Sequence, residues 1–351
     1  PIMPTLPVEF MLEKGLPAPL RTSVKFLLFN IVWTFVAGEY TGDYSQVDRV
    51  WTFLPPLYSI IYTFYPLLDS APLSVKQLGV QPRALLMTVL QLVLWCARLS
   101  SHAFRRGFFT GGGEDYRWVY IRKWIAKAPI IGSMGKPFMT FFNLSIISIY
   151  QHIILAMLAL PTYAASASPK PLHYGDALLA TLVLMALAIE FVADNQQFAY
   201  QTFKKTGKLD LDNEWPGSRI QFTTADRARG FITKGLWAYS RHPNCAGEQT
   251  VWLGMSLFPV LANWQLAHNF VDMLALLSPS LALCNLFLSS TYITESISGS
   301  KYEAYRLYKA RVGMFWPTDT LFKALYLQVW GMKKGVDEAL WAKAVLPKKE
   351  K

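Results

Sequence analysis

Seven mostly apolar stretches divide this sequence of 351 residues. A helix needs roughly 20 apolar residues to cross a bilayer, and lipid offers no hydrogen-bond partner to an open backbone, so spanning segments are helices or closed barrels. The sequence therefore predicts an all-α, polytopic membrane helix bundle with about seven transmembrane helices. The expected spans are 23–37, 50–68 (with a kink at Pro55-Pro56), 84–99, 138–160, 176–200, 249–264 and 270–289.

Composition agrees with a membrane protein. Hydrophobic residues make up 52% of the chain and charged residues 16%, whereas about a quarter of an average soluble protein is charged. A net charge of +11 would suggest nucleic acid binding in a soluble protein, but here the basic residues alternate with apolar runs. We expect no nucleic-acid partner. The three cysteines are far apart and form no disulfide framework or metal pattern.

The distribution of basic residues predicts the orientation of the bundle. With seven crossings, the segments 98–137 and 201–248 and the tail after Ser289 share one side, and they hold 27 of the 34 Lys and Arg residues. Basic loops face the cytosol, which places the N-terminus in the lumen and the C-terminus in the cytosol. Lys348 and Lys349 resemble a dilysine retrieval signal and predict the endoplasmic reticulum. The expected parts are an N-terminal flank (1–22), one membrane domain (23–317) and a basic cytosolic tail (318–351).

One polar cluster follows the third expected span, and a second lies on the fifth. Arg98 and Arg105 precede a glycine run (111–113) and an Asp115-Tyr-Arg117 segment; arginine matches phosphate geometry, although a positive-inside flank with a flexible turn would look the same. Glu190, Asp194 and Gln197 share one helix face by spacing. Carboxylates there face a bundle interior, unless the helix has already reached the interface. Lys204 and Lys205 suit a phosphate or a lipid headgroup.

Two more clusters lie further along the chain. The segment 235–248 places Arg241, His242, Asn244 and Glu248 just before an apolar run; these groups can bind an anion, an amide and a hydroxyl, and a functional site is favoured over a plain loop. Tyrosines recur every three residues at 302, 305 and 308, after Glu295. On spacing alone, an amphipathic interfacial helix is favoured over a binding site. No dinucleotide, P-loop or zinc-protease motif occurs, and the five scattered histidines predict no metal site.

Several of these motifs, in order, resemble the steroid 5α-reductase C-terminal-like membrane family, of which sterol Δ14-reductases are more distant relatives. The hallmark is Gly235-Leu-Trp-Ala-Tyr-Ser-Arg-His-Pro-Asn244 with Gly247-Glu248 and Trp252. The resemblance covers about residues 48–317. It also includes Asp48-Arg-Val-Trp51, Trp95-x-x-Arg98, Asp115-x-Arg117, Asp194-x-x-Gln197 and Lys301-Tyr302-x-x-Tyr305-x-x-Tyr308-Lys309.

The resemblance implies a seven-helix bundle with NADPH in a cytosol-facing cavity, where hydride reduces a C=C bond, an enone or alkene, of a lipid or steroid-like substrate. The bilayer and a hydrophobic small molecule would be the partners. Arg98, Arg105, Arg117 and Arg241 would hold the phosphates. Asn244 and Glu248 would contact the nicotinamide end. Asp194, Trp252, Tyr302 and Tyr305 would line the pocket, and Asp115, Lys204, His242 and Glu295 complete the expected cofactor-binding residues.

The chain departs from the family pattern at two places. The family usually has an aromatic pair before Gly-Glu, where this chain has Cys245-Ala246. Steroid reductases also polarise the substrate carbonyl with a Glu and a Tyr that do not align here. Tyr58, Tyr62 and Tyr65, on one face of the second span, are the catalytic candidates, although packing is the expected role of most of them.

Two alternatives remain open. Isoprenylcysteine carboxyl methyltransferases, which use S-adenosylmethionine, share an Arg-His-Pro before a helix, a late Glu and a Tyr-rich tail. The second alternative is a non-catalytic, lipid-binding protein of the same fold. It stays open because Cys245-Ala246 leaves a smaller surface against a cofactor.

Overall fold

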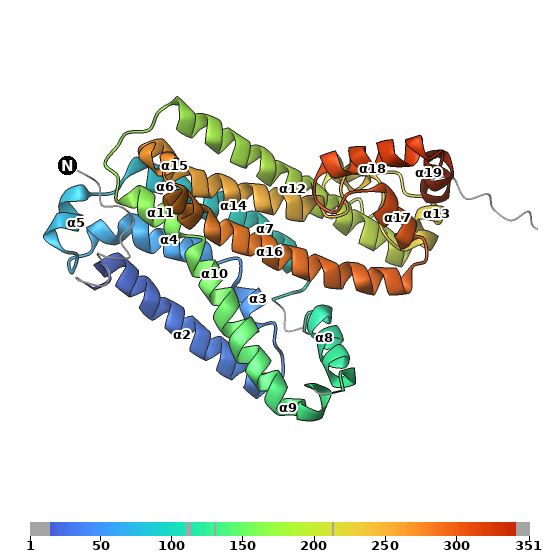
Figure 1. Cartoon of the computed structure of the whole chain (residues 1–351), viewed down its shortest axis with the longest axis horizontal. Coiled ribbons are helices and arrows are strands. Elements are labelled where there is room, and N and C mark those ends of the chain that lie inside the picture. Colours follow the sequence, from blue (N-terminus) through green and yellow to red (C-terminus); the bar gives the residue numbers. More distant parts are fainter. Residues whose placement is uncertain (1–14, 110–113, 130, 213, 342–351) are drawn as a thin grey trace, which may run out of the picture. The chain divides into compact units, whose positions relative to one another are not determined.

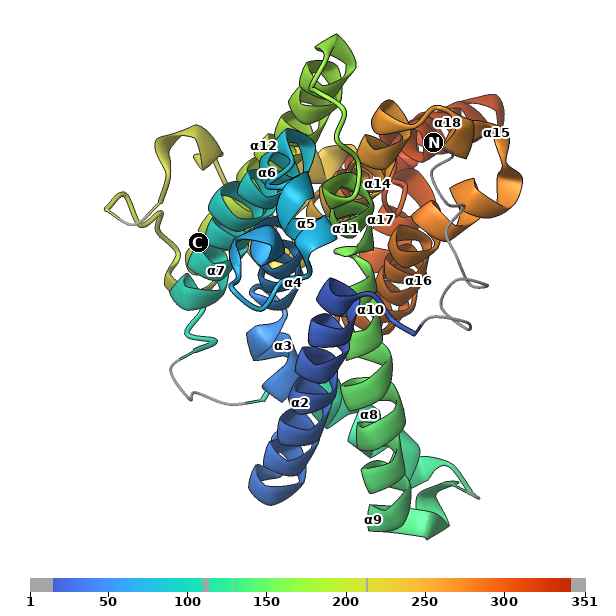
Figure 2. The same ribbon diagram turned by 90° about the vertical axis from the view of Figure 1, so that its left-hand side faces the viewer.

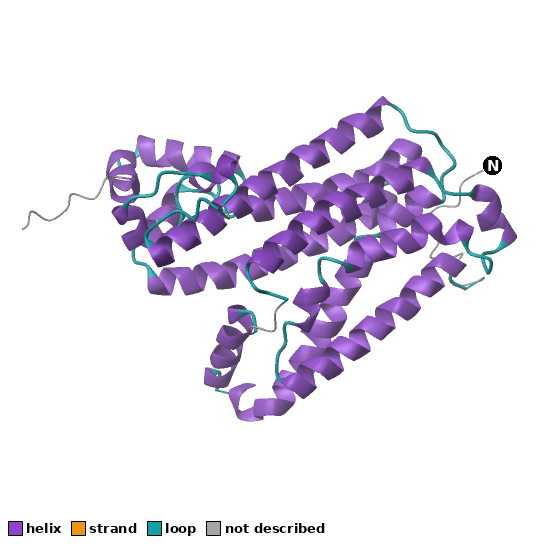
Figure 3. Cartoon of the chain, turned by 180° about the vertical axis from the view of Figure 1, so that it is seen from behind, coloured by secondary structure: helices purple, strands orange, loops and turns teal. Residues whose placement is uncertain are grey.

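The computed structural model describes residues 15–109, 114–129, 131–212 and 214–341. Within these ranges the regular structure is helical and contains no strand (Figure 3). The glycine run 111–113 and the lysine pair 348–349 lie outside the described residues.

The chain forms two compact units, which are described separately. The first comprises residues 1–183 and 252–285, and the second comprises residues 184–251 and 286–351. Three long helices contribute residues to both units: α12 (Tyr174–Thr206), α14 (Pro243–Ala262) and α16 (Phe270–Lys301).

In the part of the chain that the structure describes, five helical segments are long and apolar enough to cross a membrane, so the chain is an integral membrane protein by length and composition. They confirm five of the expected spans, extended at one or both ends. Their bounds are Ala18–Thr41, Pro82–Arg105, Gly132–Ser166, Tyr174–Thr206 and Phe270–Lys301. The total of seven and the orientation of the termini stay predictions.

The second and sixth expected spans are the two that differ. The stretch 50–68 is broken into α3 (Gln46–Val50), α4 (Leu54–Phe64) and the short η1 (Tyr65–Leu67). Its proline pair stands in the first turn of α4, where the missing N–H costs nothing, so it starts a helix where the sequence suggested a kink. Helix α14 has 20 residues, but its first turns carry the polar residues Asn244, Glu248 and Gln249.

The first unit is built from helices that pack side by side. Helix α2 (Ala18–Thr41) lies along the π-helical η3 (Asn143–Tyr150) and α10 (Gln151–Met157) (Figure 1). Helix α4 packs on α6 (Pro82–Val89) and α11 (Leu160–Ser166) (Figure 2). The other elements are α5 (Leu73–Leu78), the π-helical η2 (Leu90–Cys96), α7 (Ala97–Arg105), α8 (Tyr116–Lys127), α9 (Ile131–Phe142) and α15 (Gln265–His268).

The second unit joins the ends of α12 and α16 to a group of shorter helices. Helices α17 (Tyr305–Arg311), α18 (Pro317–Val329) and α19 (Lys333–Trp341) contact one another. Phe231 packs there against Tyr305, Tyr308, Val312 and Leu340. The connection between α12 and α14 carries η4 (Pro216–Ser218), α13 (Thr224–Arg229) and η5 (Gly235–Ala238).

A buried ion pair fixes the start of α12 to the start of α6 within the first unit. Arg83 Nε lies 2.6 Å from Asp176 Oδ1, and Arg83 Nη2 lies 2.8 Å from Asp176 Oδ2. Their side chains are 0% and 2% exposed. Arg83 also donates to the carbonyls of Lys170 and Pro171, so its charge is surrounded by acceptors.

We expect Arg83→Met to lower the stability of the protein by about 3–5 kcal/mol, because it leaves the Asp176 carboxylate buried without its partner. The melting temperature in detergent measures this loss. The double variant Arg83→Met with Asp176→Leu removes both charges, and we expect it to recover most of the melting temperature. Equal losses in the single and double variants would contradict this account.

Candidate functional site

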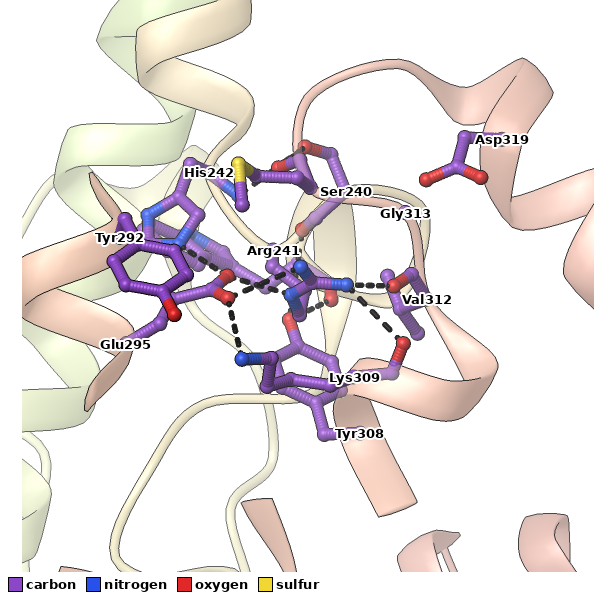
Figure 4. A network of polar contacts seen from close by, with 12 residues as sticks. Ser240, Arg241, His242, Tyr292, Glu295, Tyr308, Lys309, Val312, Gly313 and Asp319 are labelled. Carbon is purple, nitrogen blue, oxygen red and sulfur yellow. Dashed lines mark hydrogen bonds and ion pairs between the residues drawn. The ribbon is translucent and has the colours of Figure 1, made fainter. Parts of the chain in front are cut away.

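A buried ion pair between Arg241 and Glu295 is the centre of the second unit. Arg241 Nε lies 2.7 Å from Glu295 Oε1, and Nη2 lies 3.1 Å from Oε2 (Figure 4). The side chains are 3% and 0% exposed. Arg241 Nη1 also donates to the carbonyls of Lys309 and Val312. The guanidinium is thus bound on both sides by this chain's own oxygens.

The Glu295 carboxylate is approached by two further nitrogens. His242 Nε2 lies 3.0 Å from Oε1, and Lys309 Nζ lies 3.4 Å from Oε2 (Figure 4). Because a carboxylate accepts, His242 Nε2 carries the hydrogen of this bond. Burial lowers the pKa of His242 below its ordinary value, although the hydrogen bond with Glu295 acts in the opposite direction. His242 is therefore neutral near pH 7, and Arg241 is the buried positive charge that pairs with the Glu295 carboxylate.

Backbone contacts hold the loop before α14 in place. Arg241 N and His242 N donate to the carbonyls of Gly313 and Met314, at 2.9 and 3.0 Å. The Tyr308 hydroxyl donates to the carbonyl of Trp237. The residues that follow α17 therefore pack against this loop.

Asn244 presents a side-chain amide on the first turn of α14. Its Nδ2 donates to Asp194 Oδ1 of α12 at 3.1 Å. The carboxylate accepts, so the amide nitrogen faces Asp194 and the amide oxygen faces away from it. Asn244 Oδ1 is buried and makes no hydrogen bond within the described residues. A donor on a ligand would satisfy this oxygen.

Gly247 allows α14 to lie close to α12 beside this amide. A methyl group on Gly247 would lie 2.5 Å from Glu190 Cγ and 3.1 Å from the carbonyl oxygen of Ala186. Glu190 and Asp194 are 0% and 4% exposed, so both side chains lie in the interior of the second unit. The hypothesis that they face an interior is confirmed.

The Tyr302 and Tyr305 side chains belong to an aromatic cluster. The Tyr305 ring lies 4.9 Å from the Phe231 ring, and the Tyr302 ring lies 5.9 Å from it, between centroids. Lys204 Nζ donates to the Tyr302 hydroxyl and to the carbonyl of Gly230, each at 2.7 Å. Gly230 has φ of +85°, and a methyl group there would meet the Tyr302 ring at 2.2 Å. These residues pack against Phe231 and Gly230, in the connection between α12 and α14.

The predicted residues divide between the two units. Arg98, Arg105, Asp115, Arg117 and Trp252 lie in the first unit, together with Tyr58, Tyr62 and Tyr65, and the others lie in the second.

In the first unit, Asp115 caps α8, because its Oδ1 accepts from the backbone N–H of Arg117 at 2.9 Å and from its Nε at 2.8 Å. This pairing outweighs burial and keeps the pKa of Asp115 below its ordinary value. Trp252 is buried edge-on against Trp95, with ring centroids 5.0 Å apart.

The tyrosines of α4 and η1 are all buried, as the shared face suggested. The Tyr58 ring packs edge-on against Phe26, and the Tyr62 ring lies 5.3 Å from the Tyr163 ring. The Tyr58 hydroxyl is buried and makes no hydrogen bond within the described residues.

Three contributors were absent from the sequence prediction of the site. Gln196 Oε1 accepts from the backbone N–H of Leu236 at 2.9 Å, and it adjoins Gln197, which was noted. Lys309 and Tyr308 lie in the quoted tyrosine motif. Their separation of three and four residues from Tyr305 places them on its side of the helix, a signal that could have identified them.

Comparison with known proteins gives a family. The model of a family described as "Protein of unknown function (DUF1295)" matches residues 34–312. The chain belongs to the DUF1295 family. An uncharacterized protein of the fission yeast Schizosaccharomyces pombe is 32% identical over 296 residues, which cover 84% of this chain and 78% of the yeast protein. No solved structure matches the chain. The DUF1295 match contains both Arg241 and Glu295.

The pKa of His242 predicts a pH-dependent stability. Unfolded histidine takes up a proton below about pH 6.5, whereas folded His242, with its lowered pKa, does so at lower pH. Uptake therefore favours the unfolded chain, and stability falls as the pH drops from about 6.5 towards the folded pKa. We expect His242→Gln, which keeps a donor to Glu295, to reduce this slope in melting temperature.

The exposed His268 supplies the matched control. His268→Gln should melt with the same pH dependence as the unchanged protein. Identical slopes for His242→Gln and the unchanged protein would contradict the assignment of a buried neutral imidazole.

Proposed function

We propose that this protein is an NADPH-dependent membrane oxidoreductase that reduces a C=C bond, conjugated to a carbonyl or in an alkene, of a lipid or steroid-like substrate. The observation that carries the proposal is the buried, unbonded amide oxygen of Asn244. A nicotinamide carboxamide has the N–H donors that such an oxygen needs. Asp194 holds the Asn244 side chain in this orientation. The sequence resemblance gives the same role to Asn244.

The residues of the second unit fit the nicotinamide end of the cofactor better than the phosphate end. Arg241, expected to hold a phosphate, has its donors bound to Glu295, Lys309 O and Val312 O. The half-exposed Lys309 ammonium has three donors, and its contact with Glu295 is 3.4 Å long. We therefore assign phosphate contact in this unit to Lys309, with Arg241 as the residue that positions the Lys309 backbone.

Tyr58 is the residue best suited to polarise the substrate. When bound, reduced nicotinamide supplies a hydride to one carbon of the double bond, and the other carbon takes a proton. The Tyr58 hydroxyl is buried in an apolar cluster with Leu155 and Ala159 and makes no hydrogen bond within the described residues. It can donate a hydrogen bond to a substrate carbonyl that enters such surroundings.

A methyltransferase is the second candidate. Arg241, His242 and Glu295 form one hydrogen-bonded network, and these are the Arg-His-Pro and late Glu that the chain shares with isoprenylcysteine carboxyl methyltransferases. In that case S-adenosylmethionine would be the cofactor. The many basic residues in the polar segments of the sequence favour NADPH, because its three phosphates need several cations.

Titration of the purified protein with each cofactor tests the proposal. We expect saturable NADPH binding and an affinity loss of about tenfold in Asn244→Leu, since one buried hydrogen bond contributes roughly 1–3 kcal/mol. The matched control is Gln249→Leu, because that amide donates to Cys245 O inside the same helix. It should bind NADPH as the unchanged protein does.

The other outcomes are equally informative. Binding of S-adenosylmethionine without NADPH would overturn the proposal in favour of the methyltransferase. Binding of neither cofactor would favour a non-catalytic, lipid-binding protein. An equal loss of NADPH affinity in both variants would remove Asn244 from the site.

A further inference from the structure

The exposed residues of α18 form an apolar face along one side of the helix. Leu321, Phe322, Leu325, Tyr326 and Val329 are exposed by 58%, 69%, 53%, 60% and 81%. The last four follow Leu321 by one, four, five and eight residues, which places all five on one face of the helix. We call this set the α18 apolar face.

The other side of α18 attaches it to the second unit. Thr320 and Leu327 are buried there, and the Lys323 ammonium donates to the carbonyls of Lys309 and Val312 at 3.0 and 3.4 Å. The helix is therefore amphipathic, and its apolar face points away from the protein that holds it.

Helix α18 is too short to cross a membrane. It has 13 residues, whereas crossing needs roughly 20. Its surroundings are those of a helix at the membrane surface: Trp316 and Trp330 stand at its two ends, 43% and 64% exposed, and Lys333 and Lys334 follow. Tryptophan and tyrosine collect at the membrane–water interface, and lysines beside them attract lipid phosphates.

We propose that α18 is an interfacial membrane helix, whose apolar face lies at the boundary between lipid headgroups and acyl chains. The occupant is the bilayer that the chain already enters, since the second unit also contains the ends of two long apolar helices, α12 and α16. Lipid would cover the five apolar side chains of this face, and contiguous exposed apolar side chains mark contact sites for proteins or membranes.

This placement links the membrane surface to the candidate site. The carbonyls of Lys309 and Val312 accept from Lys323 of α18 and also from Arg241. The Thr320 hydroxyl bonds the carbonyl of Tyr239 at 2.6 Å and accepts from Gly313 N at 2.7 Å. A membrane-bound α18 therefore fixes the acceptors of Arg241. The inference rests on α18 itself and holds whether or not the protein is a reductase.

Fluorescence quenching in vesicles tests the placement. Phe322→Cys and Val329→Cys are each labelled with bimane in the full-length protein, and the signal is read against the parent chain, whose cysteines are buried or half-buried. The control position is Glu338→Cys on the polar α19, where the Glu338 side chain is 64% exposed. The vesicles contain phosphatidylcholine and phosphatidylserine, with spin-labelled lipid or aqueous iodide as quencher.

We expect spin-labelled lipid to quench both α18 labels at least about twofold more than the Glu338→Cys label, and iodide to show the reverse order. Iodide quenching of the α18 labels equal to that of the control would overturn the proposal. Weak quenching by both agents, with disulfide-linked dimers of Val329→Cys, would also overturn it and identify a second copy of the chain as the occupant.

Discussion

The second unit depends on an ion pair, Arg241 with Glu295, that is buried away from water. Arg241 and Glu295 form two hydrogen bonds in the interior, and a buried charge that loses its partner typically costs about 3–5 kcal/mol. The pair therefore joins segments that are 54 residues apart in the sequence. The loop before α14, the end of α16 and the turn after α17 must all be in place before either charge is satisfied.

The segment 235–248 contains residues with two different roles, which the structure separates. Arg241 and Glu295 are occupied with each other and with backbone carbonyls, so they position their neighbours. Asn244, three residues further on, is held by Asp194 and keeps a buried oxygen for another donor. Gly247 completes this arrangement, because any larger side chain would separate α14 from Glu190 of α12.

Hydropathy was sufficient for five long helices, because twenty apolar residues have few other stable arrangements in a bilayer. It did not predict the division of 50–68 into short helices, where proline starts a new helix. The helix cap was not predicted: Asp115 was expected among the cofactor-binding residues, and in the structure it caps α8 and binds Arg117, two residues further on. The occupation of Arg241 was not readable, because its partner is distant in the sequence and a motif records residue types without their contacts.

The clustering of the tyrosines around Phe231 was hidden for the same reason, since Phe231 belongs to no motif. The spacing of Tyr302 and Tyr305 indicated a shared helix side but gave no sign of what they would pack against. The family match adds 279 residues of common descent without naming a reaction. The function therefore rests on what the site residues can do chemically.

Transfer of a labelled hydride tests the central claim most directly. The purified protein is incubated with NADPH deuterated at the nicotinamide C4 position and a membrane lipid extract, and the lipids are analysed by mass spectrometry. We predict that one lipid class loses a double bond and gains one deuterium and one solvent hydrogen, and that Tyr58→Phe slows this transfer. Deuterium that stays entirely on the cofactor would contradict the account, and transfer of a labelled methyl group in a parallel incubation with S-adenosylmethionine would identify a methyltransferase.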